Sequence, residues 1–192
     1  LKDWLCILIQ SDGGEKLTPI ESELIDDAIK ANFESAQENR RLSHLSALLD
    51  GYDQNNNAPL SKRIAPWHGQ GAYNWLFDNE QDCLSLENPI LGFDLTSILD
   101  DPKARTPWLS YIFHRINALL DGRKTIIMLD EGWKLLDDPA FSYKIKDWMK
   151  TIRKQNGLIG FATQSAKDAL SSSVGDAIIE QSPTQIFLPN SR

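Results

Sequence analysis

The sequence predicts an α/β fold in which a mostly parallel sheet is flanked by helices and preceded by a helical subdomain. From about residue 88 onward, short apolar runs alternate with amphipathic stretches, which is typical of strand and helix repeats in a parallel sheet. Before residue 79, helix start and stop signals dominate. We therefore expect a helical subdomain over 1–79, whose first residues can also be the end of an upstream core element, and an α/β part over 80–192.

The segment before residue 79 is expected to hold several short helices joined by polar loops. Thr18, Pro19 and Glu21 supply an N-cap, a first-turn proline and a capping-box acid, so a helix should begin there and run to about Gln37. Apolar residues at helical spacing mark its buried face: Ile20, Leu24, Ala28, Ile25 and Phe33. A leucine stripe over 42–49 predicts a second helix, 53–57 a polar loop, and 59–67 a short helix.

Aromatic side chains gather after this short helix, at Trp67, Tyr73, Trp75 and Phe77. Aromatic rings at such spacings usually pack between helices, and base stacking is the open alternative.

The second part is expected to hold four strands, over 90–95, 126–129, 158–163 and 185–188. Thr106 and Pro107 predict the start of the helix between the first two strands, and Asp137, Asp138 and Pro139 the start of the next. That next helix carries its apolar residues at intervals of three and four, and its opposite face is basic: Lys144, Lys146, Lys150, Arg153 and Lys154. Solvation of a surface and favourable placement of cations near a helix C-terminus explain most of this basic face.

The strand over 126–129 is followed directly by two acids, Asp130 and Glu131. Ligand sites in parallel sheets lie beyond the carboxyl ends of the strands, so this pattern favours chemistry and matches a Walker B strand. The first acid would help to hold Mg²⁺, and the second would orient or deprotonate a water. A buried strand that ends in a solvated acidic turn is the alternative. Gln164, at the tip of the strand that follows, is placed to sense a γ-phosphate.

Composition limits the alternatives. The 192 residues suit one domain of ordinary size, and the formal net charge of −7 with a pI near 4.9 argues against a surface that coats nucleic acid, although it leaves a local basic patch open. Cys6 and Cys83 lack metal-ligating neighbours, which predicts buried free thiols in a reducing compartment. No apolar run approaches the roughly 20 residues that span a bilayer, and no signal peptide is visible. We expect a cytoplasmic segment that can work beside a membrane-bound partner.

An ordered series of motifs resembles the large ATPase of type IV secretion and conjugal transfer machines, the VirB-four, TrbE and CagE family. The resemblance extends over nearly the whole chain and is carried by 75–79, 92–94, 113–116, 120–123, 129–134, 147–148, 153–157, 161–165, 180–181 and 188–190.

The resemblance implies a RecA-like P-loop NTPase core with an inserted helical subdomain, which binds ATP and Mg²⁺ and hydrolyses ATP to power pilus assembly and the transfer of DNA or protein. It implies self-association, as a hexamer, at the cytoplasmic face of the bacterial inner membrane, with other secretion ATPases and inner-membrane channel components as partners. By the same resemblance, Asp130 is the Mg²⁺-side acid, Glu131 the catalytic carboxylate and Gln164 the sensor-like glutamine. Arg153 is an arginine-finger candidate that acts either in cis or across a subunit interface.

The sequence departs from this family in one respect, because it contains no Gly-x-x-x-x-Gly-Lys-Ser/Thr motif. The glycine turn over 12–16 has the wrong spacing and no hydroxyl after its lysine. Together with an opening Leu1 in place of Met, this predicts the C-terminal part of a larger ATPase, with half of an active site and no ATPase activity alone. Two alternatives stay open: a docking module for a coupling ATPase, a channel protein or single-stranded DNA, and a segment of a HerA- or FtsK-type DNA motor. The acidic charge argues mildly against DNA tracking, and direct binding of nucleic acid stays undecided.

Overall fold

The computed structural model describes residues 1–11, 16–50, 59–82, 84–131, 135–136, 138–172 and 174–189. The chain forms two compact units, Leu1–Trp108 and Leu109–Arg192. Several residues that the sequence analysis singled out lie outside the described residues: the glycine turn over 12–15, the loop over 53–57, and Cys83. The predicted boundary between residues 79 and 80 stays a prediction.

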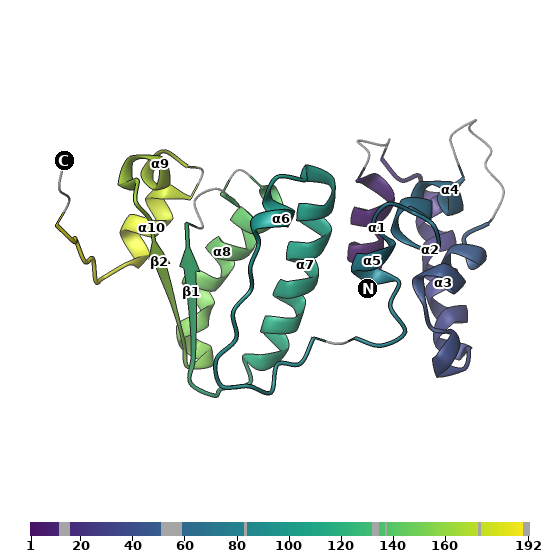
Figure 1. Ribbon diagram of the computed structural model, residues 1–192, viewed down its shortest axis with the longest axis horizontal. Helices are drawn as coiled ribbons and strands as arrows, with labels where there is room; N and C mark the ends of the chain where they lie inside the picture. The colour runs from purple at the N-terminus through teal and green to yellow at the C-terminus, as the bar shows by residue number, and fades with distance from the viewer. Residues whose placement is uncertain are drawn as a thin grey trace. The chain divides into compact units, whose positions relative to one another are not determined.

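Helices make up the regular structure described in the first unit (Figure 1). They are α1 (Lys2–Gln10), α2 (Pro19–Glu34), η1 (Gln37–Asn39), α3 (Leu42–Leu48), α4 (Leu60–Ile64), η2 (Ala65–Trp67), α5 (Asn74–Phe77) and α6 (Thr96–Leu99). Helix α7 (Pro102–Leu119) begins in this unit and ends in the second. The second unit continues with β1 (Thr125–Asp130), α8 (Pro139–Thr151), η4 (Ile152–Gln155), β2 (Gly157–Ala162), α9 (Ala166–Ser171) and α10 (Gly175–Gln181).

The predicted capping box begins α2. The Thr18 hydroxyl accepts a hydrogen bond from the Glu21 backbone N–H at 3.2 Å, and the Glu21 carboxylate accepts one from the Thr18 N–H at 2.7 Å. The helix buries Ile25 and Ala28, as expected, but Ile20 and Phe33 are each 56% exposed. Including Ile20 and Phe33 in the buried stripe was wrong, because the buried face of α2 follows Ile25, Ala28 and Asn32, and Ile20 and Phe33 project to other sides of the helix.

The aromatic residues after α4 pack against one another within the first unit. Trp67 is fully buried, stacks on Tyr73 with ring centroids 4.8 Å apart, and donates its indole N–H to the Leu8 carbonyl at 3.1 Å. Phe77 lies against both Trp67 and Trp4. These contacts confirm the interpretation of these three side chains as packing between helices.

Strands β1 and β2 form a parallel pair in the second unit, with Thr125 opposite Gly157 and Asp130 opposite Ala162. Helix α8 and η4 form the connection between them, and α8 lies alongside the strands in Figure 1. The buried face of α8 packs on α7. The ring centroid of Phe113 lies 5.6 Å from that of Phe141 and 5.0 Å from that of Trp148. This strand, helix and strand unit is the predicted α/β arrangement.

Side chains alternate along β1, and one face of the strand pair is open. Ile126, Met128 and Leu158 are 70, 64 and 55% exposed. Gly160 lies opposite Met128. A Cβ atom added to Gly160 would lie only 2.6 Å from the Met128 sulfur. Since side chains two residues apart share a face, Asp130 lies on this open face, at its carboxyl end.

Two of the four predicted strands are absent. Residues 90–95 have no strand structure; instead, the Asp94 carboxylate accepts hydrogen bonds from the backbone N–H and the hydroxyl of Thr96, which lower its pKa. Residues 185–188 are also irregular, and Ile186, Phe187 and Leu188 are each at least 80% exposed. These predictions were wrong for the described chain, because an apolar run becomes a strand only where a neighbouring strand takes up its backbone hydrogen bonds.

The predicted start of α7 was also wrong. The helix begins at Pro102, and Asp101 caps it by accepting hydrogen bonds from the N–H groups of Lys103 and Ala104. Pro107 therefore lies inside the helix. An acid and a proline, Asp101 and Pro102, lie five residues before Thr106 and Pro107, and the helix begins at this earlier pair. The Tyr73 hydroxyl also donates to Asp101, at 2.9 Å, which adds a third hydrogen bond to this cap. No described helix is long and apolar enough to cross a membrane.

Candidate active site

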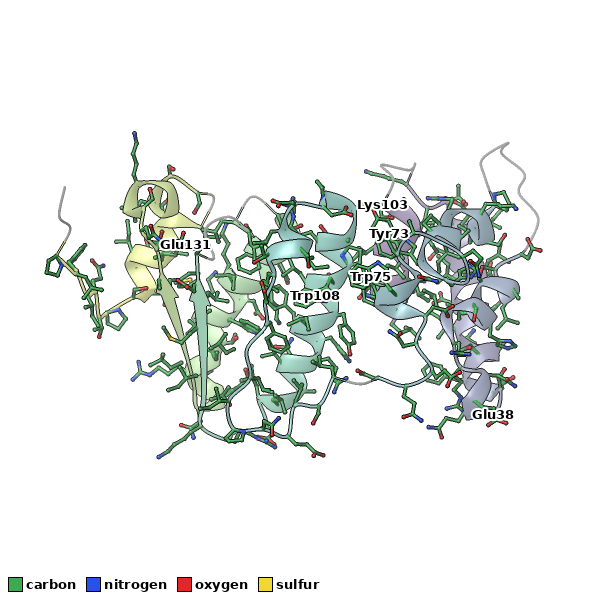
Figure 2. The ribbon with its side chains drawn as sticks, in the orientation of Figure 1. Glu38, Tyr73, Trp75, Lys103, Trp108 and Glu131 are labelled. Carbon is green, nitrogen blue, oxygen red and sulfur yellow. The ribbon has the colours of Figure 1, made fainter. Side chains whose placement is uncertain are left out.

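The two acids at the end of β1 differ in their surroundings. Asp130 is the last residue of β1, is exposed on the open face of the strand pair, and forms no ion pair with any described residue. Its carboxylate is therefore free to accept a cation or a hydrogen-bond donor from outside. Figure 2 labels Glu131 at the end of the β1 arrow.

Glu131 has a backbone conformation that residues other than glycine seldom adopt, with a φ of 51°. A side chain there costs free energy on the order of 1 kcal/mol, so surrounding interactions must hold it. One such interaction is the hydrogen bond from the Glu131 N–H to the Ala162 carbonyl at 3.0 Å, which extends the β1–β2 pairing by one residue. The left-handed turn redirects the chain directly after Asp130.

The Glu131 carboxylate lies against the end of β2. Its Oε1 accepts a hydrogen bond from the backbone N–H of Gln164 at 3.3 Å. A local turn fixes that N–H, because the Ser165 N–H donates to the Thr163 hydroxyl at 3.0 Å and this hydroxyl donates to the Ser165 carbonyl at 3.3 Å. The side chain of Gln164 is exposed.

The structure thus brings together three of the four site residues expected from the sequence: Asp130, Glu131 and Gln164. They meet because β1 and β2 are parallel and in register, so that both carboxyl ends lie at one edge of the sheet. Gln164 thus lies at the tip of the strand that follows, as the sequence analysis expected, and at the same edge as Asp130. We call this edge, with these three residues, the carboxyl edge.

Arg153 lies at the opposite edge. It belongs to η4, directly before β2, and is exposed. Since β2 is six residues long, Arg153 is separated from Glu131 by about 20 Å at ~3.3 Å per residue, beyond the reach of an arginine side chain. The structure does not bring Arg153 to the other three residues within one chain.

The buried Asp138 marks the start of α8, as the sequence analysis expected, and is a helix-capping residue, not one of the four expected site residues. Its side chain is 3% exposed and caps α8, accepting a hydrogen bond from the Phe141 N–H at 3.0 Å. In the first turn of α8, the Ser142 hydroxyl donates a hydrogen bond to the carbonyl of Leu136, which precedes the helix, so this second bond joins the first turn to the chain before it. Asp138 and Pro139 before an amphipathic run predicted the start of the helix, but nothing in the sequence predicted that the Asp138 side chain would be buried.

A magnesium ion fits the donors at the carboxyl edge. Among the described residues, no group of three or more His, Cys, Asp or Glu side chains could hold a metal ion. Mg²⁺ in nucleotide-binding sites uses one or two carboxylates, with water and phosphate oxygens as its other ligands. The exposed Asp130 carboxylate supplies a hard oxygen donor of that kind.

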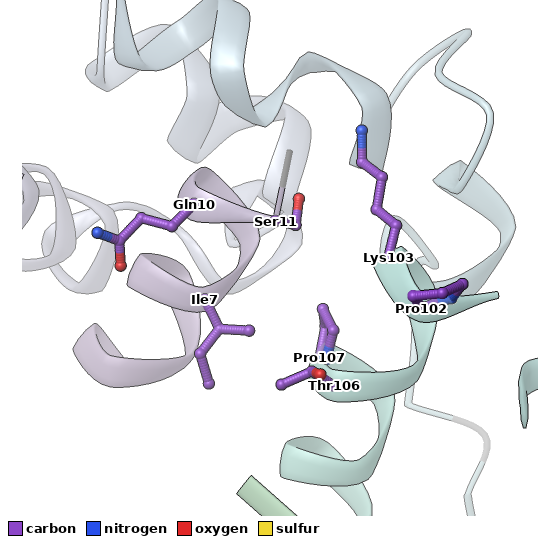
Figure 3. A pocket seen from close by; sticks show the side chains of 7 residues that line it. All are labelled: Ile7, Gln10, Ser11, Pro102, Lys103, Thr106 and Pro107. Atoms are coloured by element: carbon purple, nitrogen blue, oxygen red, sulfur yellow. The ribbon is translucent and has the colours of Figure 1, made fainter. Parts of the chain in front are cut away.

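A cavity of about 330 Å³ lies in the first unit and is separate from these residues (Figure 3). Its walls come from α1 and the start of α7: Ile7, Gln10, Ser11, Pro102, Lys103, Thr106 and Pro107. None of the four expected site residues lines it.

Comparisons with known proteins agree with the geometry. The sequence model of the TraG P-loop domain family matches residues 22–192. The chain is 42% identical over 194 residues to a type IV secretion system protein virB4 of Bartonella henselae, covering all of this chain and 24% of that protein. It is 38% identical to a virB4 of Brucella abortus, covering 96% of this chain and 23% of that protein. It is 39% identical to the type IV secretion system protein PtlC of Bordetella pertussis over 79% of this chain. The chain therefore spans about a quarter or less of the length of these curated relatives.

Proposed function

Because this chain belongs to the TraG P-loop domain family, we propose that it is the Walker B half of an ATPase that powers a type IV secretion system. The observation that carries the proposal is the hydrogen bond between Glu131 and Gln164 at the carboxyl edge of a parallel strand pair. This bond lies at the carboxyl ends of parallel strands, where nucleotide-binding α/β proteins hold their ligands, and it therefore supports the proposal. The activity is proposed for the longer polypeptide that carries this segment together with a phosphate-binding loop, which we call the full-length protein.

Asp130 is the proposed ligand on the magnesium side of the nucleotide. Its place at the paired end of β1 positions its backbone, and its exposure leaves its oxygens available. A bound Mg²⁺ would neutralise charge on the β- and γ-phosphates.

Glu131 is the proposed base that orients the attacking water and removes its proton. The Gln164 N–H donates to one of its carboxylate oxygens and so helps to orient the side chain. A carboxylate is the kind of acceptor that can bind the attacking water and take its proton. Gln164, whose backbone N–H the same turn holds, carries the amide side chain that is the proposed sensor of the γ-phosphate. Hydrolysis would then change the hydrogen bonding of a residue joined to the base.

The proposed setting follows from the relatives, which are named as type IV secretion system proteins. We propose that the full-length protein assembles with itself, as a hexamer, and with other secretion ATPases and channel components at the cytoplasmic face of the inner membrane. The predicted division at residues 79 and 80, into a helical subdomain and an ATPase core, is part of this proposal.

Titration with ATP tests the function directly. We expect the full-length protein to bind ATP in a magnesium-dependent manner and to hydrolyse it, and the 192-residue segment to show neither property, since it has no phosphate-binding loop. Turnover by the segment that Glu131→Gln abolishes would contradict the predicted inactivity of the segment. Absence of nucleotide binding by the full-length protein would instead favour a docking module for secretion-channel partners.

A further inference from the structure

The connection from α8 to β2 ends in the dipeptide Asn156-Gly157, at the other end of β2 from Gln164. An asparagine followed by glycine is the pair at which a protein chain deamidates most readily, because glycine has no Cβ to hinder attack by its own backbone nitrogen. The sequence contains this pair once. Asn156 is exposed, so water has access to it.

The turn before β2 depends on both residues of the pair. Asn156 follows η4 in the left-handed conformation, with a φ of 60° and a ψ of 28°, which asparagine adopts more readily than most residues that carry a side chain. A Cβ atom added to Gly157 would lie 2.5 Å from Cγ1 of Ile152, a buried residue. Replacement of either residue would strain the turn, so this geometry favours the reactive pair.

Three hydrogen bonds hold Asn156 in the turn. Its backbone N–H donates to the Arg153 carbonyl at 3.2 Å, and its carbonyl accepts from the N–H of Thr125, the first residue of β1, at 3.4 Å. Its side-chain amide donates to the Gly122 carbonyl at 3.1 Å. The last two bonds join the start of β2 to the start of β1.

The same conformation keeps the reacting atoms apart. Deamidation begins when the Gly157 nitrogen attacks Cγ of Asn156, which requires both atoms to lie on the same side of the bond between Cα and the carbonyl carbon of Asn156. At a ψ of 28°, the Gly157 nitrogen is turned away from the side chain. The bond to Gly122 also holds the amide in place. Attack therefore requires these contacts to break.

We propose that Asn156 is a deamidation site that the pairing of β1 and β2 holds closed, and that the site opens when the start of this strand pair separates. In the open chain, the Gly157 nitrogen loses its proton and forms a bond to Cγ, while the bond from Cγ to Nδ2 breaks and the nitrogen leaves as ammonia. Water then opens the resulting succinimide at either of its carbonyls, which gives aspartate or isoaspartate. The net reaction consumes water, releases ammonia and needs no other reactant.

Both products would weaken the strand pair. Aspartate has no N–H to donate to the Gly122 carbonyl and places a carboxylate oxygen against it. Isoaspartate adds a methylene group to the main chain directly before β2, so the pairing of Thr125 with Gly157 could no longer be kept. Because β2 leads to Gln164, the modification would act on the carboxyl edge from the other end of the strand.

Incubation of the full-length protein, folded in buffer or unfolded in guanidinium chloride, tests the proposal. Trypsin cleavage after Lys154 and Lys167 releases the peptide with Asn156, and mass spectrometry measures its deamidated fraction over time. In the unfolded protein, Asn156 should deamidate faster than Asn39, because the side chain of the following Arg40 hinders attack. In the folded protein, the rate at Asn156 should fall by at least about tenfold, because attack needs a local opening.

Equal rates at Asn156 in the folded and the unfolded protein would overturn the closed state. A rate in the unfolded protein no higher than that at Asn39 would overturn the site itself. As a second readout, Asn156→Asp reproduces one product and should speed amide hydrogen exchange in β1 and β2 of the full-length protein. Asn39→Asp, at an exposed position of the first unit, is the matched control and should leave this exchange unchanged. Unchanged exchange in Asn156→Asp would contradict the effect on the strand pair. These measurements need no nucleotide, so their outcomes do not depend on the proposed function.

Discussion

The backbone N–H of Gln164 donates a hydrogen bond to the carboxylate of Glu131, 3.3 Å away, across the ends of two neighbouring strands. This bond joins the residue proposed to activate water to the residue proposed to sense phosphate. A backbone donor persists when side chains are changed, so the orientation of Glu131 and the chemistry of Gln164 can be altered separately.

Glu131→Gln in the full-length protein should abolish hydrolysis without abolishing binding. Glutamine keeps the shape and one acceptor oxygen but removes the negative charge that draws a proton from water. Turnover should fall by the roughly 10²–10⁴ that a lost general base costs, with ATP affinity retained. Single-turnover kinetics beside equilibrium titration measures both quantities. Glu180→Gln, the same change at an exposed position of α10, is the control and should behave as wild type.

Asp130→Asn should instead weaken nucleotide binding through its metal. Asparagine lacks the charge that attracts Mg²⁺, which neutralises phosphate in the ground state and in the transition state alike. ATP affinity should therefore drop, and higher magnesium concentration should partly restore it. If Asp130→Asn kept full affinity while Glu131→Gln lost it, the two assigned roles would have to be exchanged.

Gln164→Ala should lower turnover while leaving the Glu131 side chain in place. Alanine retains the backbone N–H that Glu131 accepts and removes only the amide that would contact phosphate. Loss of one such preorganised donor costs roughly 10²–10³ in the chemical step. Gln155→Ala removes an exposed glutamine from η4, at the other end of β2 from Gln164, and should have no effect on the rate. Equal losses in both variants would argue against the sensor role.

Trp148→Ala should destabilise the second unit strongly. Trp148 is 1% exposed, packs its ring against Phe113, and donates its indole N–H to Asn117 at 2.8 Å. Removing it should lower the free energy of unfolding by about 3–5 kcal/mol. Asn117→Ala leaves the ring but deprives its N–H of a partner, at a cost of about 1–3 kcal/mol. Tyr143 lies on the same helix and is 76% exposed. Tyr143→Ala should therefore change the free energy of unfolding, measured with denaturant, by less than about 0.5 kcal/mol.

The Asp121 carboxyl should titrate at unusually low pH. Hydrogen bonds from the Arg123 side chain and backbone lower its pKa from 3.8 to about 2. Because the folded pKa lies below the ordinary value, the stabilisation from this pair is present above about pH 4 and is lost as the pH falls through about 2. NMR titration of the Asp121 carboxyl measures this directly. Arg123→Ala should return the pKa toward 3.8, and an unchanged pKa would show that the guanidinium is not its cause.

Local signals predicted much of the secondary structure. The capping box at Thr18 and Glu21, the leucine stripe of α3, and the apolar runs of β1 and β2 all formed where expected. In each case the stabilising groups lie within a few residues, or the apolar run found a parallel neighbour. The apolar runs over 90–95 and 185–188 carried the same signal but form no strand, because strand formation depends on backbone partners that a single run does not specify.

The sequence by itself determined the residue types of the site, since two acids after an apolar run and a glutamine after the next run can be identified without coordinates. Only the tertiary structure decided where these residues lie relative to one another. The parallel register of β1 and β2 brings Glu131 and Gln164 together, and the left-handed conformation of Glu131 aims its carboxylate at that N–H. The same register places Arg153 one strand length away, at the other edge. The number of residues between two positions does not reveal whether they lie at the same end of the sheet, because the relative direction of two strands is fixed only when they pair.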